Sequence, residues 1–118
     1  MTIIHGDCGG LVFRMDATNT KFYYFEVCTN GSYGLYVYSD NKFKTLTGNI
    51  SPAITTGLNQ PNTIAVVANG NTLDLYVNHQ KIDSVRDSTY TGGYIGLDAD
   101  ALSNPTEVAF SNTRVWTW

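Results

Sequence analysis

The feature that most constrains this fold is a stretch, residues 8–38, in which three short segments are separated by polar turns. The segments cover residues 8–15, 22–28 and 33–38, and they are rich in aromatic and β-branched side chains. Gly, Asn, Asp and Ser bound each of them. Such segments are typical of strands, and short turns between them favour an antiparallel meander. The sequence therefore predicts three neighbouring strands in one sheet.

The alternation within these segments sorts their side chains onto two faces of the predicted sheet, because successive side chains of a strand point in opposite directions. The apolar set, which is expected to face a core, is Leu11, Phe13, Phe25, Val27, Leu35 and Val37. The set on the opposite face is Val12, Arg14, Tyr24, Glu26, Tyr36 and Tyr38. One Arg, one Glu and three Tyr on a single face make it the candidate binding surface.

The chain has two cysteines, and the predicted hairpin brings them together. If strands 8–15 and 22–28 pair across the loop at residues 16–20, directly opposed residues have numbers that sum to about 36. Cys8 then lies opposite Cys28 on the same face, as a cross-strand disulfide requires. The alternative is two half-buried free thiols, because a shift of one residue in register would separate them. A disulfide would favour an extracytoplasmic location.

Length and composition indicate one all-β domain over residues 1–118. Charged residues make up 14% of the chain and there are 11 glycines, which argues against disorder and against a coiled coil. Further strands are expected at residues 2–5, 43–46, 63–68, 72–77, 81–85, 94–97, 107–110 and 114–118. No segment keeps a 3.6-residue apolar period, so the prediction is a two-layer antiparallel β-sandwich of nine or ten strands.

Charge and hydropathy exclude several classes of partner. The net charge is −3 and the seven basic residues are scattered, which argues against nucleic-acid binding. No apolar run approaches the roughly 18 residues of a membrane span. The first residues have a strand pattern and no signal-peptide pattern. We therefore expect the chain to be a fragment of a longer domain, with any exporting segment upstream.

Catalysis has little support in the residues. Glycosidases generally use two carboxyl groups that flank the scissile bond. The chain has only two Glu, at positions 26 and 107, and they are far apart in the sequence. His79 falls in an expected turn, where a backbone role is sufficient. We therefore predict no catalytic residue, and favour a protein that is not an enzyme.

Metal binding is also weakly supported, and no cofactor is predicted. No His or Cys cluster has the spacing of a zinc site. Calcium would need carboxylates on loops, for which Asp98 and Asp100, or the pair Asp40 and Asn41, are weak candidates. Short polar loops commonly have this composition without a metal.

Taken in order, the strands resemble a known superfamily. The segments that carry the resemblance are Gly9-Gly-Leu-Val-Phe-Arg14, Tyr23-Tyr-Phe-Glu-Val27, Gly34-Leu-Tyr-Val37 and Gly70-Asn-Thr-Leu-Asp-Leu-Tyr-Val-Asn78. They are similar to the concanavalin A-like lectin/glucanase jelly roll, in the branch of laminin-G-like domains and 3-keto-disaccharide hydrolases. The resemblance covers nearly all of the chain. Family domains generally begin with additional strands, most of which are absent here.

The resemblance implies a function as well as a fold. Related modules occur outside the membrane in bacterial multidomain proteins, including receptor-type serine/threonine kinases, and the concave sheet of this fold is the usual ligand surface. The Glu-x-Asp-x-x-Glu pattern of the glucanases is absent. His79 stands where relatives commonly have Gly, which concerns the geometry of a turn.

The leading functional hypothesis is a non-catalytic, extracytoplasmic binding or sensor module for carbohydrate. Its site would consist of Arg14, Tyr24, Glu26, Tyr36 and Tyr38, with Tyr stacking on sugar rings and the charged groups holding hydroxyls. In the alternative interpretation Arg14 and Glu26 form a cross-strand ion pair and the Tyr side chains simply cover the sheet. Two other classes stay open: part of a glycoside-processing hydrolase, and an assembly module that forms a homodimer through an open sheet edge.

Overall fold

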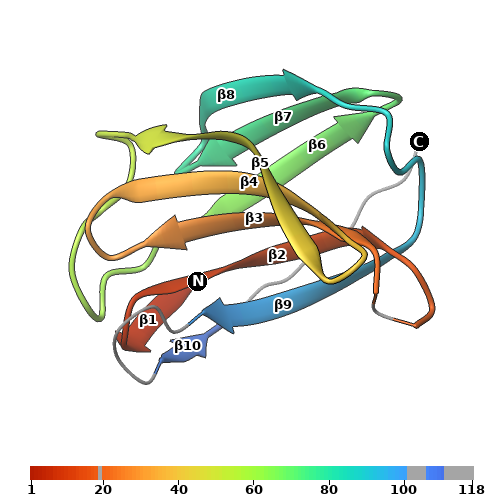
Figure 1. Ribbon diagram of the computed structural model, residues 1–118. Coiled ribbons are helices and arrows are strands. Elements are labelled where there is room, and N and C mark those ends of the chain that lie inside the picture. The colour runs from red at the N-terminus through yellow and green to blue at the C-terminus, as the bar shows by residue number, and fades with distance from the viewer. Residues whose placement is uncertain (19, 101–105, 111–118) are drawn as a thin grey trace.

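The computed structural model describes residues 1–18, 20–100 and 106–110, and within them the chain is built from strands joined by turns (Figure 1). The strands are β1 (Thr2–His5), β2 (Cys8–Met15), β3 (Phe22–Cys28), β4 (Ser32–Ser39), β5 (Lys42–Ile50), β6 (Ile64–Asn69), β7 (Thr72–Val77), β8 (Gln80–Arg86), β9 (Tyr94–Asp100) and β10 (Glu107–Ala109). No helix in the described part is long and apolar enough to span a membrane.

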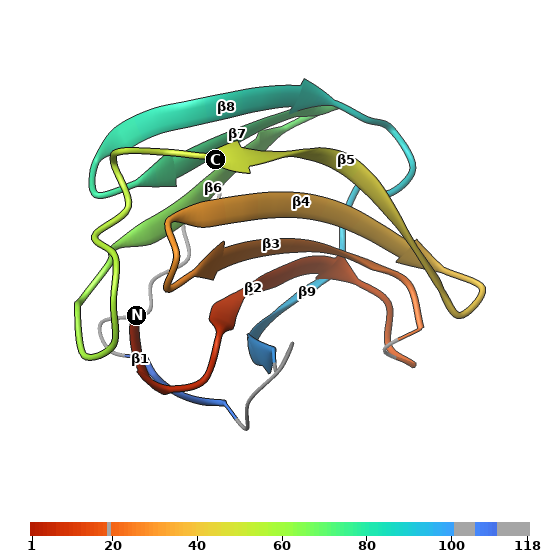
Figure 2. The ribbon, with the colours of Figure 1, turned by 60° about the vertical axis from the view of Figure 1, so that its left-hand side comes forward.

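The strands form two packed layers, which confirms the predicted antiparallel jelly-roll sandwich. One layer is a five-stranded sheet in the order β5-β4-β3-β2-β9, and the other contains the three-stranded sheet β6-β7-β8. Strands β1 and β10 form a separate pair. Figure 2 shows β6, β7 and β8 lying across one face of the curved five-stranded sheet. We call that face the inner face and the opposite one the outer face.

The predicted register of the meander is confirmed. Cys8 pairs with Cys28, and the numbers of the opposed residues sum to 36 as far as the pair of Phe13 with Tyr23. Strand β4 continues the meander by pairing Tyr24 with Tyr36. A fixed register means that the residues on each face of these strands can be assigned from their parity.

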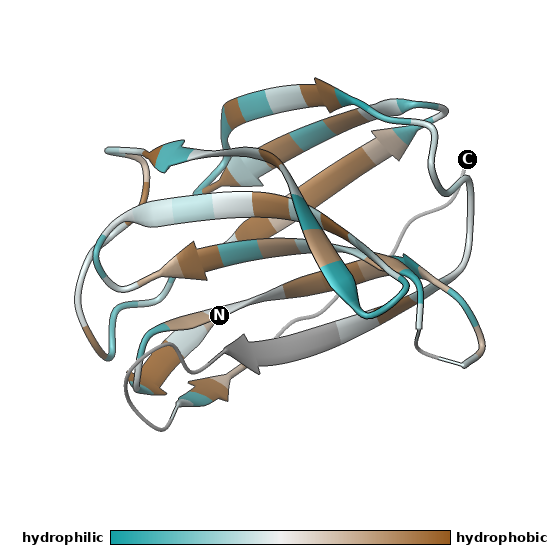
Figure 3. Ribbon diagram, viewed as in Figure 1, coloured by the Kyte–Doolittle hydropathy of each residue, from teal (hydrophilic) through white to brown (hydrophobic). Residues whose placement is uncertain are grey.

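The core lies between the inner face and β6–β8. Five of the six residues expected there are buried in it: Phe13, Phe25, Val27, Leu35 and Val37. From the other layer β7 contributes Leu73, Leu75 and Val77, and Figure 3 shows the alternation of apolar and polar residues along this strand. Leu11 is partly buried and lies outside the cluster. Burial of each large apolar side chain contributes about 1.5–3 kcal/mol to folding.

Strands β5 and β9 extend well beyond the ends that the sequence predicts. The expected segment 43–46 is part of β5, which runs to Ile50 although Gly48 and Asn49 are poor strand formers. Pairing along the whole of β4 overrides that local preference. Strand β9 likewise continues through residues 98–100, where a loop was expected, because it pairs with β2 as far as Cys8. The strand expected at 114–118 lies outside the described residues.

Two tight turns have the backbone that their sequences require. Asp40 and Asn41 have φ of 51° and 61°, and Asn78 and His79 have φ of 51° and 66°. Positive φ at both central residues defines the two-residue hairpin turn that matches strand twist. The prediction that His79 serves a turn is therefore confirmed.

Asp83 of β8 links the two layers through hydrogen bonds. Its carboxylate accepts hydrogen bonds from Tyr33 Oη at 3.0 Å and from Thr47 Oγ1 at 2.7 Å, both on the five-stranded sheet. Burial alone would raise the pKa of Asp83, but the hydrogen bonds from Thr47, the Ser84 amide and Tyr33 bring it below its ordinary value.

Asp87 makes a second tie, to Tyr23. The Tyr23 ring is fully buried, and its hydroxyl donates to the Asp87 carboxylate. The Tyr90 amide in turn donates to the Tyr23 oxygen at 3.2 Å, and Tyr90 Oη donates to the Tyr38 carbonyl at 2.7 Å. These bonds hold the segment between β8 and β9 against the five-stranded sheet.

Candidate functional site

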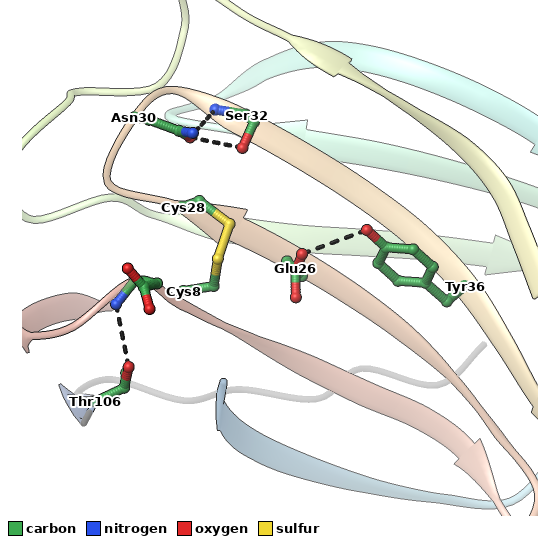
Figure 4. The surroundings of a disulfide bond; sticks show 8 residues. Cys8, Glu26, Cys28, Asn30, Ser32, Tyr36 and Thr106 are labelled. Atoms are coloured by element: carbon green, nitrogen blue, oxygen red, sulfur yellow. Dashed lines mark hydrogen bonds between the residues drawn. A yellow bond between two sulfur atoms is a disulfide. The ribbon is translucent and has the colours of Figure 1, made fainter. Parts of the chain in front are cut away.

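The outer face begins, at one end, with a disulfide between Cys8 and Cys28 (Figure 4). The two Cα atoms are 4.1 Å apart, close to the spacing of a directly opposed pair without ladder hydrogen bonds. Both cysteines are buried. The hairpin register, rather than any special loop, brings them together.

Glu26 stands in the next row of the outer face, and both of its cross-strand neighbours are glycines. It pairs with Gly10 on β2 and with Gly34 on β4, so no neighbouring Cβ crowds its side chain. Tyr36 Oη donates a hydrogen bond to Glu26 Oε1 at 3.3 Å (Figure 4). Glu26 is only 7% exposed, so this face holds a carboxylate that is almost fully enclosed.

The two glycines are required by the rings that lie over them. A Cβ at Gly34 would overlap the Tyr36 ring, and one at Gly10 would overlap the Phe25 carbonyl oxygen and meet the Tyr24 ring. The rings of Tyr24 and Tyr36 are 6.2 Å apart between centroids, on the same side of the sheet. The glycines therefore let these two tyrosines lie flat beside Glu26.

A group of aromatic rings continues the outer face away from Glu26, and we call it the aromatic cluster: Phe22, Tyr36, Tyr38 and Phe43. Phe22 stacks on Tyr38 with centroids 4.9 Å apart. Phe43 lies 4.6 Å from Tyr38 and 6.2 Å from Tyr36. Phe43 is 59% exposed, whereas the other three are half-buried. The cluster is thus an apolar platform open to solvent at Phe43.

Arg14 is not part of this face, and the prediction that it lies beside Glu26 is wrong. Its Nη1 donates to the carbonyls of Gly70, in the β6–β7 turn, at 2.8 Å and of Tyr90 at 3.0 Å. Arg14 has a φ of 51°, and the pairing of β2 with β9 is irregular at this point. Gly93 packs so closely that a Cβ there would overlap the backbone of residues 14 and 15. This local distortion turns the guanidinium toward the other layer.

The other four predicted residues do lie together. Tyr24, Glu26, Tyr36 and Tyr38 share the outer face, with Tyr24 and Glu26 buried and the other two half-buried. Phe22 and Phe43 also lie on this face and were not among the predicted site residues. Parity alone places Phe22 with Tyr24. The two-residue turn at Asp40 and Asn41 sets Phe43 opposite Tyr38, so this pairing was also readable from the sequence.

The weak calcium candidates lie on a strand and in a tight two-residue turn. Residues 98 and 100 belong to strand β9 and not to a loop, and the side chains of Asp98 and Asp100 lie outside the described part of the structure. Asp40 and Asn41 form the tight β4–β5 turn, and Asn41 Oδ1 accepts a hydrogen bond from Tyr38 Oη at 3.4 Å.

Comparison with solved structures finds the same fold in other proteins, among them the following two. One is a carbohydrate-binding module, CBM66, from Bacillus subtilis, with a TM-score of 0.73 and 19% sequence identity. The alignment covers 81% of this chain and 60% of that module. The other is sheep galectin-11 in complex with glycerol, with a TM-score of 0.60, 12% identity, and coverage of 81% and 83%. Both are β-sandwiches of the concanavalin A-like, jelly-roll kind.

At these identities the likeness shows the fold alone, and this chain corresponds to about three fifths of the CBM66 module's length. No protein-family model matches the sequence, and no curated protein does.

Proposed function

We propose that the chain is a non-catalytic carbohydrate-binding module whose ligand surface is the outer face of the five-stranded sheet. The observation that carries the proposal is the aromatic cluster, which is open to solvent at Phe43 and adjoins an enclosed carboxylate at Glu26. Aromatic rings stack on the apolar faces of sugars, and a few placed polar groups fix the hydroxyls. The name of one protein that shares the fold, a carbohydrate-binding module, adds support.

The residues divide into a platform and a polar anchor. Phe22, Tyr38 and Phe43 supply the stacking area. Tyr36 Oη donates to Glu26 Oε1, and this hydrogen-bonded pair beside the platform supplies the polar anchor. Arg14 has no role in this proposal, because its guanidinium is bound to backbone carbonyls near the other layer.

The proposed setting is extracytoplasmic. Disulfides persist in oxidising compartments. The Cys8–Cys28 bond links β2 to β3, the strand that carries Glu26. The same proposal places the chain in the laminin-G-like branch, as a sensor module of a longer bacterial protein such as a receptor-type serine/threonine kinase. Two copies would meet through β5 or β9, the edges of the five-stranded sheet, which sedimentation of the chain would measure.

A glycan array probed with the folded chain tests the function, followed by titration of an oligosaccharide that binds. Phe43→Ala should weaken binding about tenfold, equivalent to ~1.4 kcal/mol. Ile50→Ala is the matched control, because Ile50 is 71% exposed on the same strand and lies outside the aromatic cluster. Absence of any bound glycan, or equal losses in the two variants, would refute the proposal.

A further inference from the structure

Three potential metal ligands meet at the enclosed end of the outer face. One ligand atom from each of Cys8, Glu26 and Cys28 lies within 4.8 Å of the other two. The three residues are 0%, 7% and 5% exposed, respectively. In the oxidised chain the two sulfur atoms are bonded to each other and are not free to bind a cation.

The sheet register explains the grouping. Cys28 and Glu26 are two residues apart on β3, so their side chains are successive on the outer face. Cys8 is opposite Cys28 and therefore diagonal to Glu26. The glycines at positions 10 and 34 leave the Glu26 side chain room to reach the cysteine pair.

We propose that reduction of the disulfide converts this group into a site for a soft divalent cation, such as Zn²⁺, bound by both thiolates and the Glu26 carboxylate. Zinc prefers thiolate, imidazole and carboxylate ligands, with Zn–S bonds of about 2.3 Å. Tetrahedral geometry then separates two thiolates by roughly 3.7 Å. The Cα atoms of Cys8 and Cys28 are 4.1 Å apart. Their side chains must therefore rotate after reduction to bring the two sulfur atoms to that separation.

A trialkylphosphine is a suitable reductant for the bond between Cys8 and Cys28. A trialkylphosphine donates two electrons to the S–S bond and becomes a phosphine oxide with the oxygen of a water molecule, whose two protons complete the two thiols. Cation binding then releases both thiol protons to solvent, so affinity rises with pH. Three protein ligands leave a fourth position for water.

The disulfide and the metal are alternative cross-links between β2 and β3. A bound cation would restore the link that reduction removes, and reoxidation would expel the cation. Zn²⁺ should therefore raise the urea midpoint of the reduced chain and leave that of the oxidised chain unchanged. This inference does not depend on carbohydrate binding, so each can fail without the other.

The test titrates Co²⁺, as a coloured substitute for Zn²⁺, into the phosphine-reduced chain without oxygen. We expect thiolate-to-cobalt charge-transfer absorption that saturates at one metal per chain. Cys8→Ser should lose this absorption. Glu26→Gln should keep the sulfur bands but bind Co²⁺ more weakly, with altered ligand-field bands. The oxidised chain should show none of these bands.

Three results would overturn the proposal: no charge-transfer absorption in a reduced chain whose near-ultraviolet circular dichroism shows native packing, the same absorption in Cys8→Ser, or a Glu26→Gln variant identical to the parent in affinity and spectrum. An unfolded reduced chain that Zn²⁺ fails to refold would count against it as well.

Discussion

The inner and outer faces of one sheet use the same residue type for different purposes. Tyr23 and Tyr33 point inward, have rings buried in the core, and donate their hydroxyls to Asp87 and Asp83 across the layers. Tyr38, the residue directly after the core residue Val37 on β4, lies on the opposite face and packs against Phe22 and Phe43. Strand parity alone decides which role a tyrosine takes.

The difference separates stability from recognition. The inner tyrosines connect two layers through carboxylates whose hydrogen bonds replace water, so removing one should loosen the sandwich. On the outer face, the rings of Phe22, Tyr38 and Phe43 pack on one another, and Phe43 is exposed to solvent. Changes to them should alter a ligand surface while the fold persists.

The largest expected contrast lies between two phenylalanines. Phe25→Ala removes a fully buried ring and should destabilise the chain by about 3–5 kcal/mol. Phe43→Ala removes a ring that is 59% exposed and should change stability by about 0.5 kcal/mol or less. Urea unfolding measures both. Equal losses would mean that the outer cluster is a second core and not an open surface.

The disulfide lies on the outer face and is nevertheless expected to contribute strongly to stability. Replacing Cys8 and Cys28 together by Ala frees a loop with a sequence separation of 20 residues. The unfolded chain gains entropy, so the free energy of unfolding should fall by about 3 kcal/mol. An unchanged urea midpoint would show that the hairpin is fixed without the bond.

Removing a tyrosine hydroxyl should cost more stability on the inner face than on the outer face. Tyr33→Phe deletes a 3.0 Å hydrogen bond to the half-buried Asp83 carboxylate and should cost about 1.5–3 kcal/mol. Tyr38→Phe deletes an exposed 3.4 Å contact with Asn41 and should cost about 0.5 kcal/mol or less. A larger loss of stability in Tyr38→Phe than in Tyr33→Phe, measured by thermal or urea unfolding, would contradict this difference between the faces.

The smallest effect is the pH dependence of the inter-layer tie at Asp83. Its pKa is lowered on folding, so the stability it contributes is complete above the unfolded value and is lost as pH falls through the folded value. The stability difference between the parent and Asp83→Asn should therefore shrink below pH 3.8, the ordinary pKa of Asp. A constant difference from pH 7 down to acid unfolding would contradict this assignment.

Features that depend on neighbouring strands could be predicted from the sequence. The polar turns and alternating side chains defined the β2–β3–β4 meander, and the hairpin register placed Cys8 opposite Cys28. The same parity grouped Tyr24 with Tyr36. Each of these follows from local turn geometry and a period of two residues.

Features that depend on distant segments could not be predicted. Arg14 leaves its face because Gly93, far along the chain, packs on the β2 backbone where Arg14 has a left-handed φ. Asp83 and Asp87 acquire their roles only when the two layers meet, and no local pattern marks them. The alternation rule ends where the backbone ceases to be a regular strand.

The most direct test of the outer face is amide chemical-shift mapping by NMR, during titration with an oligosaccharide identified on the glycan array. The account predicts that the largest shifts occur at outer-face positions of β3, β4 and β5, centred on Tyr36, Tyr38 and Phe43. Shifts confined to β6–β8 or to the turn at Asn78 and His79 would contradict it.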